Sequence, residues 1–565
     1  MRNDLDGGEA LLEAFRSLGV EYVISSPGSE WAPIWEAVAR QQTTGAVGPR
    51  YIDVWHETLA VGMAIGYTLY TGRMQAVLLH AGAGLLQGTC GIHGAQLAEV
   101  PLLVCSSEAI TYGERVGLDP GSQWYRNLSV VGGTHGLVDG ITKWSNQVGS
   151  IQVLYEMAKR AGELAQRTPR GPVYLNVPVE VLLESWTPPA NKKDVVPPAR
   201  RISPPDEIDR LVRAVAAAEN PVILTESAGR TPGAFEALVR FAESFGVPVV
   251  EAQSTVCGNF PKTHPLYLGT KFEPFAAGSD LVLLISCRAP WYPPSNRPAK
   301  AATIVIDETP QRPHMVHQVL FADMYLEGNI ADTLNAAADR ARGHVDASKL
   351  AQRLQKHAAA HKQLRAEIAG IETKASAGPA IAPAALVKAM REVLPDDTIY
   401  VDETITHSRV VQQHLAWTEP QRYFYVQGGL GQGIGVALGV KMAAPEKPVT
   451  LVLGDGTFLY NPVVQALGAS KDNKLPILIV ILNNKKYLSM KFNHLRAYPE
   501  GIAVKNNLFH GVDLSTQPPL HRFGEPYSMH CAEVSQLSEL EPALRAAAAS
   551  VNGGTTAIVN VMLTT

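Results

Sequence analysis

The sequence predicts an α/β protein built from three doubly wound parallel sheets. Short apolar strands alternate with helical stretches along the whole chain, and this alternation is typical of βαβ units and parallel sheets. At 565 residues the chain is too long for one hydrophobic core and suggests about three domains. We expect these at residues 1–188, 205–342 and 381–565, with a linker rich in Pro, Lys and Arg over residues 192–205.

Composition and charge exclude several classes of function. The net charge of −4 gives no basis for binding nucleic acid or an anionic membrane, and no apolar run has the length of a membrane helix. The N-terminal residues enter an amphipathic helix without a signal-like apolar run. The five cysteines are scattered without metal-type spacing, so we expect reduced thiols in a cytoplasmic enzyme.

The first two domains are predicted from strands bounded by turns and helices. A helix over residues 57–70 is rich in Ala and Gly and ends at Gly72, a residue that commonly stops helices. A helix over residues 348–371 is expected to lie on the surface or to connect domains. Strands are expected at residues 22–26, 51–54, 74–80, 102–105 and 173–177, and then at 222–224, 247–250, 281–285 and 303–307.

The third domain carries the most informative stretch. A strand at 449–453 leads into Gly454-Asp455-Gly456, and after a helix a second apolar strand at 477–482 ends in two asparagines. The carboxyl ends of neighbouring parallel strands meet at one edge of a sheet, where α/β proteins bind ligands. Glycines and a helix N-terminus favour a phosphate, and acid and amide oxygens suit Mg²⁺. Other features of this domain are a strand at 398–402, a glycine-rich turn at 428–433 opening a helix at 434–442, a lid-like segment at 488–526 and a last strand at 557–561.

This spacing resembles the cofactor motif of the thiamine diphosphate (ThDP)-dependent decarboxylases and carboligases, the family of acetohydroxyacid synthase, benzoylformate decarboxylase and benzaldehyde lyase. The resemblance covers essentially the whole chain. It implies that the first domain binds the pyrimidine ring of the cofactor, that the second is a central domain, and that the third binds the diphosphate. It implies that Mg²⁺ is held by the side chains of Asp455 and Asn484 and by the carbonyl of Lys486. If Gly-Asp-Gly were considered without the rest of the motif, the alternative would be a glycine turn in an ordinary doubly wound domain that binds no cofactor.

Further cofactor residues follow from the same resemblance. Glu57, in His56-Glu57, matches the glutamate that activates the cofactor, and the alternative is an acid that favours a helix N-terminus. Leu430 matches the apolar wedge beneath the cofactor, or it simply packs a helix on the sheet. The carbonyl of Gly428 is expected to accept from the pyrimidine amino group. The remaining matched positions are Gly454, Gly456, Thr404, Thr406, Thr457 and Tyr460 around the diphosphate.

Three residues are candidates for contact with the substrate. Residues 25–30 and 78–84 resemble two active-site stretches of benzoylformate decarboxylase, in which Ser29 and His80 match a serine and a histidine. A serine can bind a carboxylate and a histidine can transfer protons, although His80 also suits a core position after a buried strand. Gln123 lies roughly where carboligases of the family carry a glutamine.

The departures from the family are equally informative. The second histidine of benzoylformate decarboxylase has no counterpart in residues 288–294, where Trp291 and Tyr292 instead suggest a bulky pocket. The histidine pair of pyruvate decarboxylase is absent from residues 112–123. Both absences favour carboligation or lyase chemistry over simple release of an aldehyde.

The resemblance implies decarboxylation of a 2-oxo acid, followed by carboligation or aldehyde release, in a homodimer or homotetramer whose active sites lie between subunits. Alternatives are a lyase acting on 2-hydroxyketones or 2-hydroxyacyl thioesters, and a flavin-containing oxidase of the pyruvate oxidase type. A nicotinamide-dependent dehydrogenase is a third, since the fold alone does not exclude a dinucleotide. A catalytically silent ThDP-binding subunit is a fourth, which the presence of Glu57 disfavours.

Overall fold

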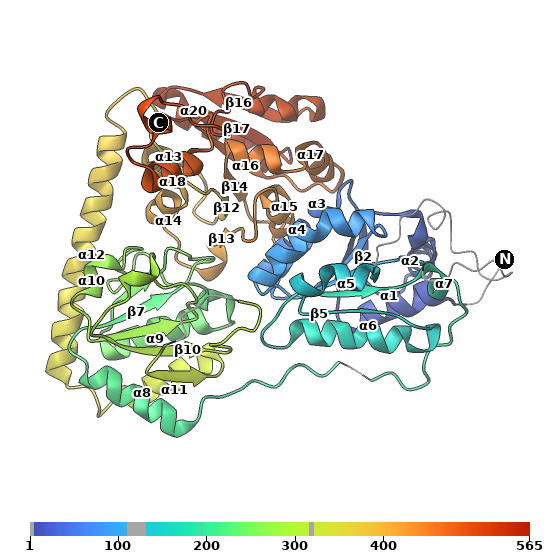
Figure 1. Ribbon diagram of the computed structural model, residues 1–565, viewed down its shortest axis with the longest axis horizontal. Helices are drawn as coiled ribbons and strands as arrows, with labels where there is room; N and C mark the ends of the chain where they lie inside the picture. The colour runs from blue at the N-terminus through green and yellow to red at the C-terminus, as the bar shows by residue number, and fades with distance from the viewer. Residues whose placement is uncertain (1–4, 110–131, 194, 316–320, 565) are drawn as a thin grey trace.

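The computed structural model describes residues 5–109, 132–193, 195–315 and 321–564. It contains three parallel sheets, each flanked by helices, which confirms the predicted fold class. In Figure 1 the first sheet lies on the right, the central one at the lower left and the third at the top. Among the described residues, no helix is long and apolar enough to cross a membrane.

The first sheet has six strands in the order β2-β1-β3-β4-β6-β5. All of its paired strands run parallel, so their carboxyl ends share one edge. The strands are β1 (Tyr22–Ser25), β2 (Arg50–Asp53), β3 (Gln75–Leu79), β4 (Leu102–Ser106), β5 (Trp144–Gln147) and β6 (Val173–Asn176). The helices are α1 (Gly7–Ser17), α2 (Ala32–Thr44), α3 (Glu57–Thr71), α4 (Ala83–Leu97), α5 (Gly133–Val138), α6 (Ile151–Gln166) and α7 (Val179–Leu182).

The central sheet has five strands in the order β11-β10-β9-β7-β8. Its strands are β7 (Pro221–Thr225), β8 (Val249–Glu251), β9 (Leu281–Ile285), β10 (Ala302–Asp307) and β11 (Met324–Glu327). Its helices are α8 (Pro205–Ala217), α9 (Ala234–Phe245), α10 (Glu273–Ala276) and α11 (Ile330–Ala341). The long helix α12 (Ala347–Ala375) runs along one side of the molecule from the central to the third domain, as a connecting helix was predicted to do (Figure 1).

The third sheet has six strands in the order β13-β12-β14-β15-β17-β16. They are β12 (Ile399–Glu403), β13 (Tyr423–Tyr425), β14 (Val449–Gly454), β15 (Leu478–Asn483), β16 (His530–Val534) and β17 (Ala557–Met562). The helices are α13 (Pro383–Val393), α14 (Ser408–His414), α15 (Gly433–Ala443), α16 (Asp455–Tyr460), α17 (Val463–Asp472), α18 (Leu488–Ala497), α19 (Ile502–Lys505) and α20 (Leu537–Asn552).

Two glycine-rich helices join the first and third domains. A Cβ atom at Gly66 would lie 2.0 Å from the carbonyl oxygen of Val436, and one at Gly439 would lie 2.0 Å from that of Met63. Larger residues would therefore push α3 and α15 apart. The small residues of both helices thus hold the start of α3 close to the glycine-rich turn that precedes α15.

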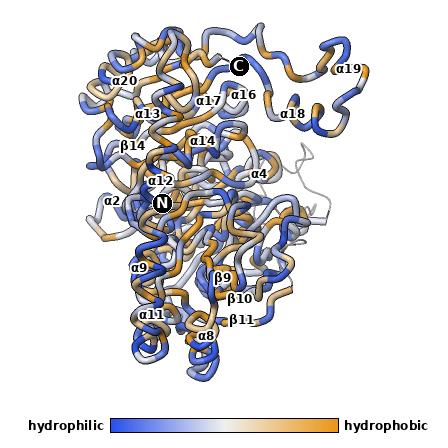
Figure 2. The backbone as a smooth tube through the Cα atoms, turned by 90° about the vertical axis from the view of Figure 1, so that its left-hand side faces the viewer, coloured by the Kyte–Doolittle hydropathy of each residue, from blue (hydrophilic) through white to orange (hydrophobic). Residues whose placement is uncertain are grey.

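The segment after β15 differs from the lid-like loop predicted from its weak periodicity. It contains α18 and α19 and a 3-10 helix at Leu520–Tyr527. Figure 2 shows α18 and α19 extending away from the rest of the third domain. The side chain of Arg496 on α18 donates a 2.8 Å hydrogen bond to the hydroxyl of Tyr292, which ties this segment to the central domain.

Candidate active site

The predicted metal ligands lie at the carboxyl edge of the third sheet. Gly454 on β14 pairs with Leu482 on β15, so the chain leaves both strands at the same level. Asp455 begins α16, and the nearby backbone amides of Gly456, Lys485 and Lys486 partly offset the effect of burial on the pKa of its carboxyl group. The side-chain oxygen of Asn484 accepts from the amide of Lys486 at 3.0 Å. The structure therefore brings Asp455, Asn484 and Lys486 together.

The Asp455 carboxylate is arranged to receive a cation. Only 3% of this residue is exposed, and within the described residues its Oδ2 atom has no hydrogen-bond partner. Burial raises the pKa of Asp455 to about 6. A buried carboxylate oxygen without a partner is costly, and a bound metal ion removes that cost. One acid, one amide and one carbonyl suit Mg²⁺, whereas His and Cys ligands would suit other metals.

Small residues and aromatic rings surround the turn after β14. A Cβ atom at Gly456 would lie 2.3 Å from the ring of Tyr487, so only glycine fits there. The rings of Tyr487 and Tyr460 meet edge to face with centroids 6.4 Å apart. Thr457 is buried one residue after Gly456, while Tyr460 is 60% exposed. The turn is thus open to a ligand on the side of Tyr460.

The glycine-rich turn lies against the same helix. Gly428 and Gly431 have φ angles of 92° and 98°, which side chains other than glycine rarely adopt. A Cβ atom at Gly431 would lie 2.5 Å from the carbonyl oxygen of Tyr460, so the turn and the end of α16 are in contact. Leu430 is half-buried at the tip of this turn.

The two threonines that follow β12 differ in their surroundings. Thr404 is buried, and its hydroxyl donates to Oδ1 of Asp402 at 2.7 Å, as does its backbone amide at 2.8 Å. The hydroxyl proton of Thr404 is therefore engaged within the protein. Thr406 is half-buried. Their contacts with a diphosphate stay predictions, and the hydroxyl bond favours Thr404 as a residue that shapes the turn.

Glu57 lies at the carboxyl edge of the first sheet, at the start of α3. His56 caps this helix by accepting a 3.2 Å hydrogen bond from the amide of Thr58 at its Nδ1 atom. A Cβ atom at Gly84 would lie 2.9 Å from Oε1 of Glu57, so α4 begins beside this carboxylate. In the part of the chain that the structure describes, the Glu57 side chain makes no hydrogen bond or ion pair.

His80 lies close to Glu57 and is held by Glu30, an acid for which the sequence pattern predicted no role. The Nδ1 atom of His80 is 2.9 Å from Oε1 of Glu30, which also accepts from the amide of Ala81 at 2.8 Å. The hydrogen bond to Glu30 and the charges of Glu30 and Glu57 raise the pKa of His80, although its burial opposes them. A Cβ atom at Gly28 would lie 2.1 Å from Nδ1, so glycine is required there.

Ser29 follows Gly28 and is exposed. The structure therefore places Ser29, Glu30, Glu57 and His80 at one edge of the first sheet. Gln123 lies outside the described residues. Trp291 stacks on Phe272 and lines a cavity of about 380 Å³ whose lining residues all come from the central domain. A role of this segment in a substrate pocket stays a prediction.

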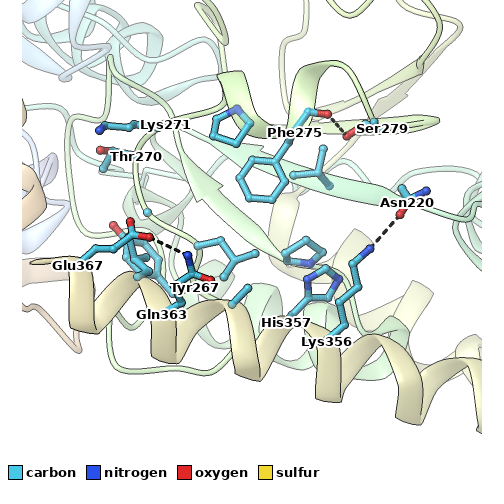
Figure 3. Close-up of a pocket in the computed structure, with 18 of the residues that line it drawn as sticks. Asn220, Tyr267, Thr270, Lys271, Phe275, Ser279, Lys356, His357, Gln363 and Glu367 are labelled. Carbon is cyan, nitrogen blue, oxygen red and sulfur yellow. Dashed lines mark hydrogen bonds between the residues drawn. The ribbon is translucent and has the colours of Figure 1, made fainter.

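Two large cavities formed by the described residues lie away from these two edges. A cavity of about 510 Å³ lies between α12 and the amino ends of the central strands (Figure 3). Another of about 560 Å³ lies along the linker between the first and central domains.

The described residues thus place an acid, an amide and a carbonyl at the carboxyl edge of the third sheet, and two acids and a histidine at the carboxyl edge of the first. Models of the thiamine pyrophosphate enzyme family match its N-terminal TPP binding domain to residues 5–130, its central domain to 208–337 and its C-terminal TPP binding domain to 404–561. The chain belongs to the family of thiamine pyrophosphate enzymes.

Individual relatives agree with this family. The chain is 25% identical over 580 residues to the acetolactate synthase isozyme 3 large subunit of Escherichia coli, covering 99% of this chain and 94% of that one. It is 26% identical over 499 residues to the benzoylformate decarboxylase of Pseudomonas aeruginosa, covering 86% and 87%. The thiamine diphosphate-dependent 4-hydroxybenzoylformate decarboxylase of Rhodococcus jostii has the same fold, with a TM-score of 0.79 over 99% of both chains at 22% identity.

Proposed function

We propose that this protein is a Mg²⁺- and ThDP-dependent enzyme that decarboxylates a 2-oxo acid and joins the product to a second carbonyl or releases it as an aldehyde. The observation that carries the proposal is the buried Oδ2 atom of Asp455, which has no partner among the described residues and lies beside Asn484 and Lys486. The family and the names of the relatives support the choice of cofactor and reaction.

The residues at the third sheet would hold the charged end of the cofactor. Asp455, Asn484 and the carbonyl of Lys486 would bind Mg²⁺, and the turn from Gly454 to Thr457 would bind the diphosphate together with Thr406 and Tyr460. Gly428 and Leu430 would support the rings. When bound, ThDP supplies a nucleophilic carbon and an electron sink for cleavage of the bond next to a carbonyl.

The residues at the first sheet would move protons and bind substrate. Glu57 would exchange a proton with the cofactor through its carboxyl group, which makes no hydrogen bond in the described structure. Because Glu30 occupies the Nδ1 atom of His80, the Nε2 atom is the one available to a substrate. Ser29 would donate its hydroxyl to the substrate carboxylate. Gln123 is proposed as a further residue that contacts the substrate.

We further propose that the active enzyme is a homodimer or homotetramer in the cytoplasm. Large apolar side chains are exposed beside both edges, which favours their burial by a second subunit. The exposed fractions are 57% for Trp55, 52% for Leu86, 38% for Leu459 and 50% for Val464. The five cysteines are unpaired, as is usual in a reducing compartment. Light scattering on the purified protein measures the subunit number directly.

The structure disfavours the alternative of a flavin-containing oxidase. A nucleotide would bind at the carboxyl ends of β7 and β9, where the strand order of the central sheet reverses. A cavity there measures only about 70 Å³, and an ion pair of the protein lies in its lining. Arg312 binds Asp307 at 3.1 Å. Small-molecule sites usually measure hundreds of cubic ångströms.

The proposed function is tested by CO₂ release from a panel of aliphatic and aromatic 2-oxo acids with ThDP and Mg²⁺ supplied. We expect release from at least one acid, dependent on both additions. Identification of the organic product then separates an aldehyde from a 2-hydroxyketone. If no acid releases CO₂ while ThDP binds, the decarboxylase proposal is wrong and lyase action on 2-hydroxyketones or 2-hydroxyacyl thioesters is favoured.

Glu30 holds His80 through a hydrogen bond to its Nδ1 atom. We expect Glu30→Gln to lower the pKa of His80, because the hydrogen bond to Glu30 is the main cause of its raised value. The limb of the pH–rate profile that belongs to His80 should therefore move to lower pH, while Glu36→Gln, an exposed neighbour on α2, should leave it unchanged. An unchanged profile in Glu30→Gln would show that His80 does not titrate in the reaction.

A further inference from the structure

Glu403 is a buried acid at the end of β12, and the proposed function gives it no role. Only 1% of this residue is exposed, and no cation pairs with it among the described residues. Its carboxylate instead accepts from neutral donors. The amide of Gln432 donates at 2.8 Å and the side-chain amide of Asn461 at 2.9 Å, and the neighbouring amides of Gly431 and Gly433 also favour the charged form of the acid.

The glycine-rich turn is shaped around this carboxylate. A Cβ atom at Gly433 would lie 2.5 Å from Oε2 of Glu403, so a larger residue would displace the acid. The donated amides belong to the turn itself and to the start of α15. A carboxylate at a helix N-terminus satisfies amides that have no partner within the helix. Glu403 therefore fixes a turn in which Gly428 and Gly431 have positive φ angles.

Asn461 extends the same network to the diphosphate turn. Its side-chain nitrogen donates to Glu403 at 2.9 Å and to the carbonyl of Thr457 at 3.0 Å. Its side-chain oxygen accepts from the amide of Ile434 on α15 at 3.1 Å. A single carboxylate thus joins the end of β12, the glycine-rich turn and α16, which are the segments that carry Thr404, Leu430 and Thr457.

We propose that Glu403 is a positioning residue that holds the glycine-rich turn against α16 and so prepares the apo-protein to bind its cofactor. The link to the cofactor rests on the proposed function, whereas the fixing of the turn does not. Because the hydrogen bonds of this acid, within the described residues, come from the turn and Asn461, it acts on the cofactor through Gly428 and Leu430. Burial also raises the pKa of Glu403 to about 7, in agreement with an acid that only amides stabilise.

The test uses Glu403→Gln in the full chain, because glutamine keeps the shape but places a donor where the turn also donates. We expect hydrogen exchange at the amides of residues 431–433 to become at least about tenfold faster in the apo-protein. We also expect the Kd for ThDP with Mg²⁺, measured by fluorescence quenching, to rise roughly tenfold or more. Asn461→Ser removes one member of the network and should act in the same direction.

Glu372→Gln is the matched control. Glu372 is also buried and binds Arg391 at 2.8 Å and His414 at 2.8 Å, but it lies on α12. This variant should change neither exchange at residues 431–433 nor the Kd for ThDP. Unchanged exchange in both Glu403→Gln and Asn461→Ser would overturn the inference, and faster exchange with an unchanged Kd would overturn its link to the cofactor. If the unaltered protein does not bind ThDP, the proposed function fails, while the exchange result still tests the fixing of the turn.

Discussion

Replacing Glu57 with glutamine is expected to lower kcat by about 10²- to 10⁴-fold, the usual contribution of a general acid–base group. Glutamine has nearly the same shape but cannot exchange a proton with the cofactor. The helix cap is provided by His56, so α3 should begin at the same residue in the variant. Steady-state kinetics at saturating ThDP and Mg²⁺, with the preferred 2-oxo acid, measure the loss.

Glu36→Gln is the control for a loss of negative charge in the first domain, because Glu36 is exposed on α2. We expect that variant to keep full activity. Binding of ThDP by Glu57→Gln should change far less than kcat, since the diphosphate and metal contacts come from the third domain. A Glu57→Gln enzyme with near-normal kcat would contradict the assigned role and leave Glu57 as an acid that only stabilises the start of α3.

Replacing Asp455 with asparagine is expected to have opposite effects on binding and on stability. Loss of a direct metal ligand should weaken ThDP binding in the presence of Mg²⁺ by more than about 100-fold, since even outer contacts are worth 10- to 100-fold. The apo-protein should become more stable near pH 7.5, by about 1–3 kcal/mol, because a buried ionised carboxylate is replaced by a neutral group.

The pH dependence of this stabilisation follows from the raised pKa. In the unfolded chain Asp455 ionises near its ordinary value of 3.8, whereas in the folded protein it ionises at about 6. The unaltered protein therefore loses stability as the pH rises from about 4 to 6, and Asp455→Asn does not. Urea unfolding of both apo-proteins at pH 4.5 and 7.5 measures the difference, which should be larger at pH 7.5. A variant less stable than the unaltered protein at pH 7.5 would show that Asp455 is already stabilised without metal.

The sequence was sufficient to predict the three sheets and the two edges that carry the candidate residues. Apolar strands such as residues 477–482 are buried on both faces, so their composition alone identifies them, and the turn of Gly454 and Asp455 has a local pattern. The edge strands β5, β11, β13 and β16 were not predicted. Three of them, β5, β11 and β16, contain polar residues, and β13 is only three residues long, so all four lack that pattern.

The supporting residues of the site could not be predicted because their partners are distant in sequence. Glu30 meets His80 across 50 positions, and Glu403 meets Asn461 across 58. The sequence does not reveal that an acid is buried, because the residues that bury it are brought to it only by the fold.

Equilibrium binding of ThDP to the unaltered protein and to Asp455→Asn, with Mg²⁺ and with EDTA, tests the central claim most directly. The claim is that the edge formed by Asp455, Asn484 and Lys486 holds the diphosphate through a divalent metal ion. We predict tight binding only for the unaltered protein with Mg²⁺, and loss of that binding with EDTA or with Asp455→Asn. Equal affinity of the two proteins, or binding that ignores the metal, would contradict the claim.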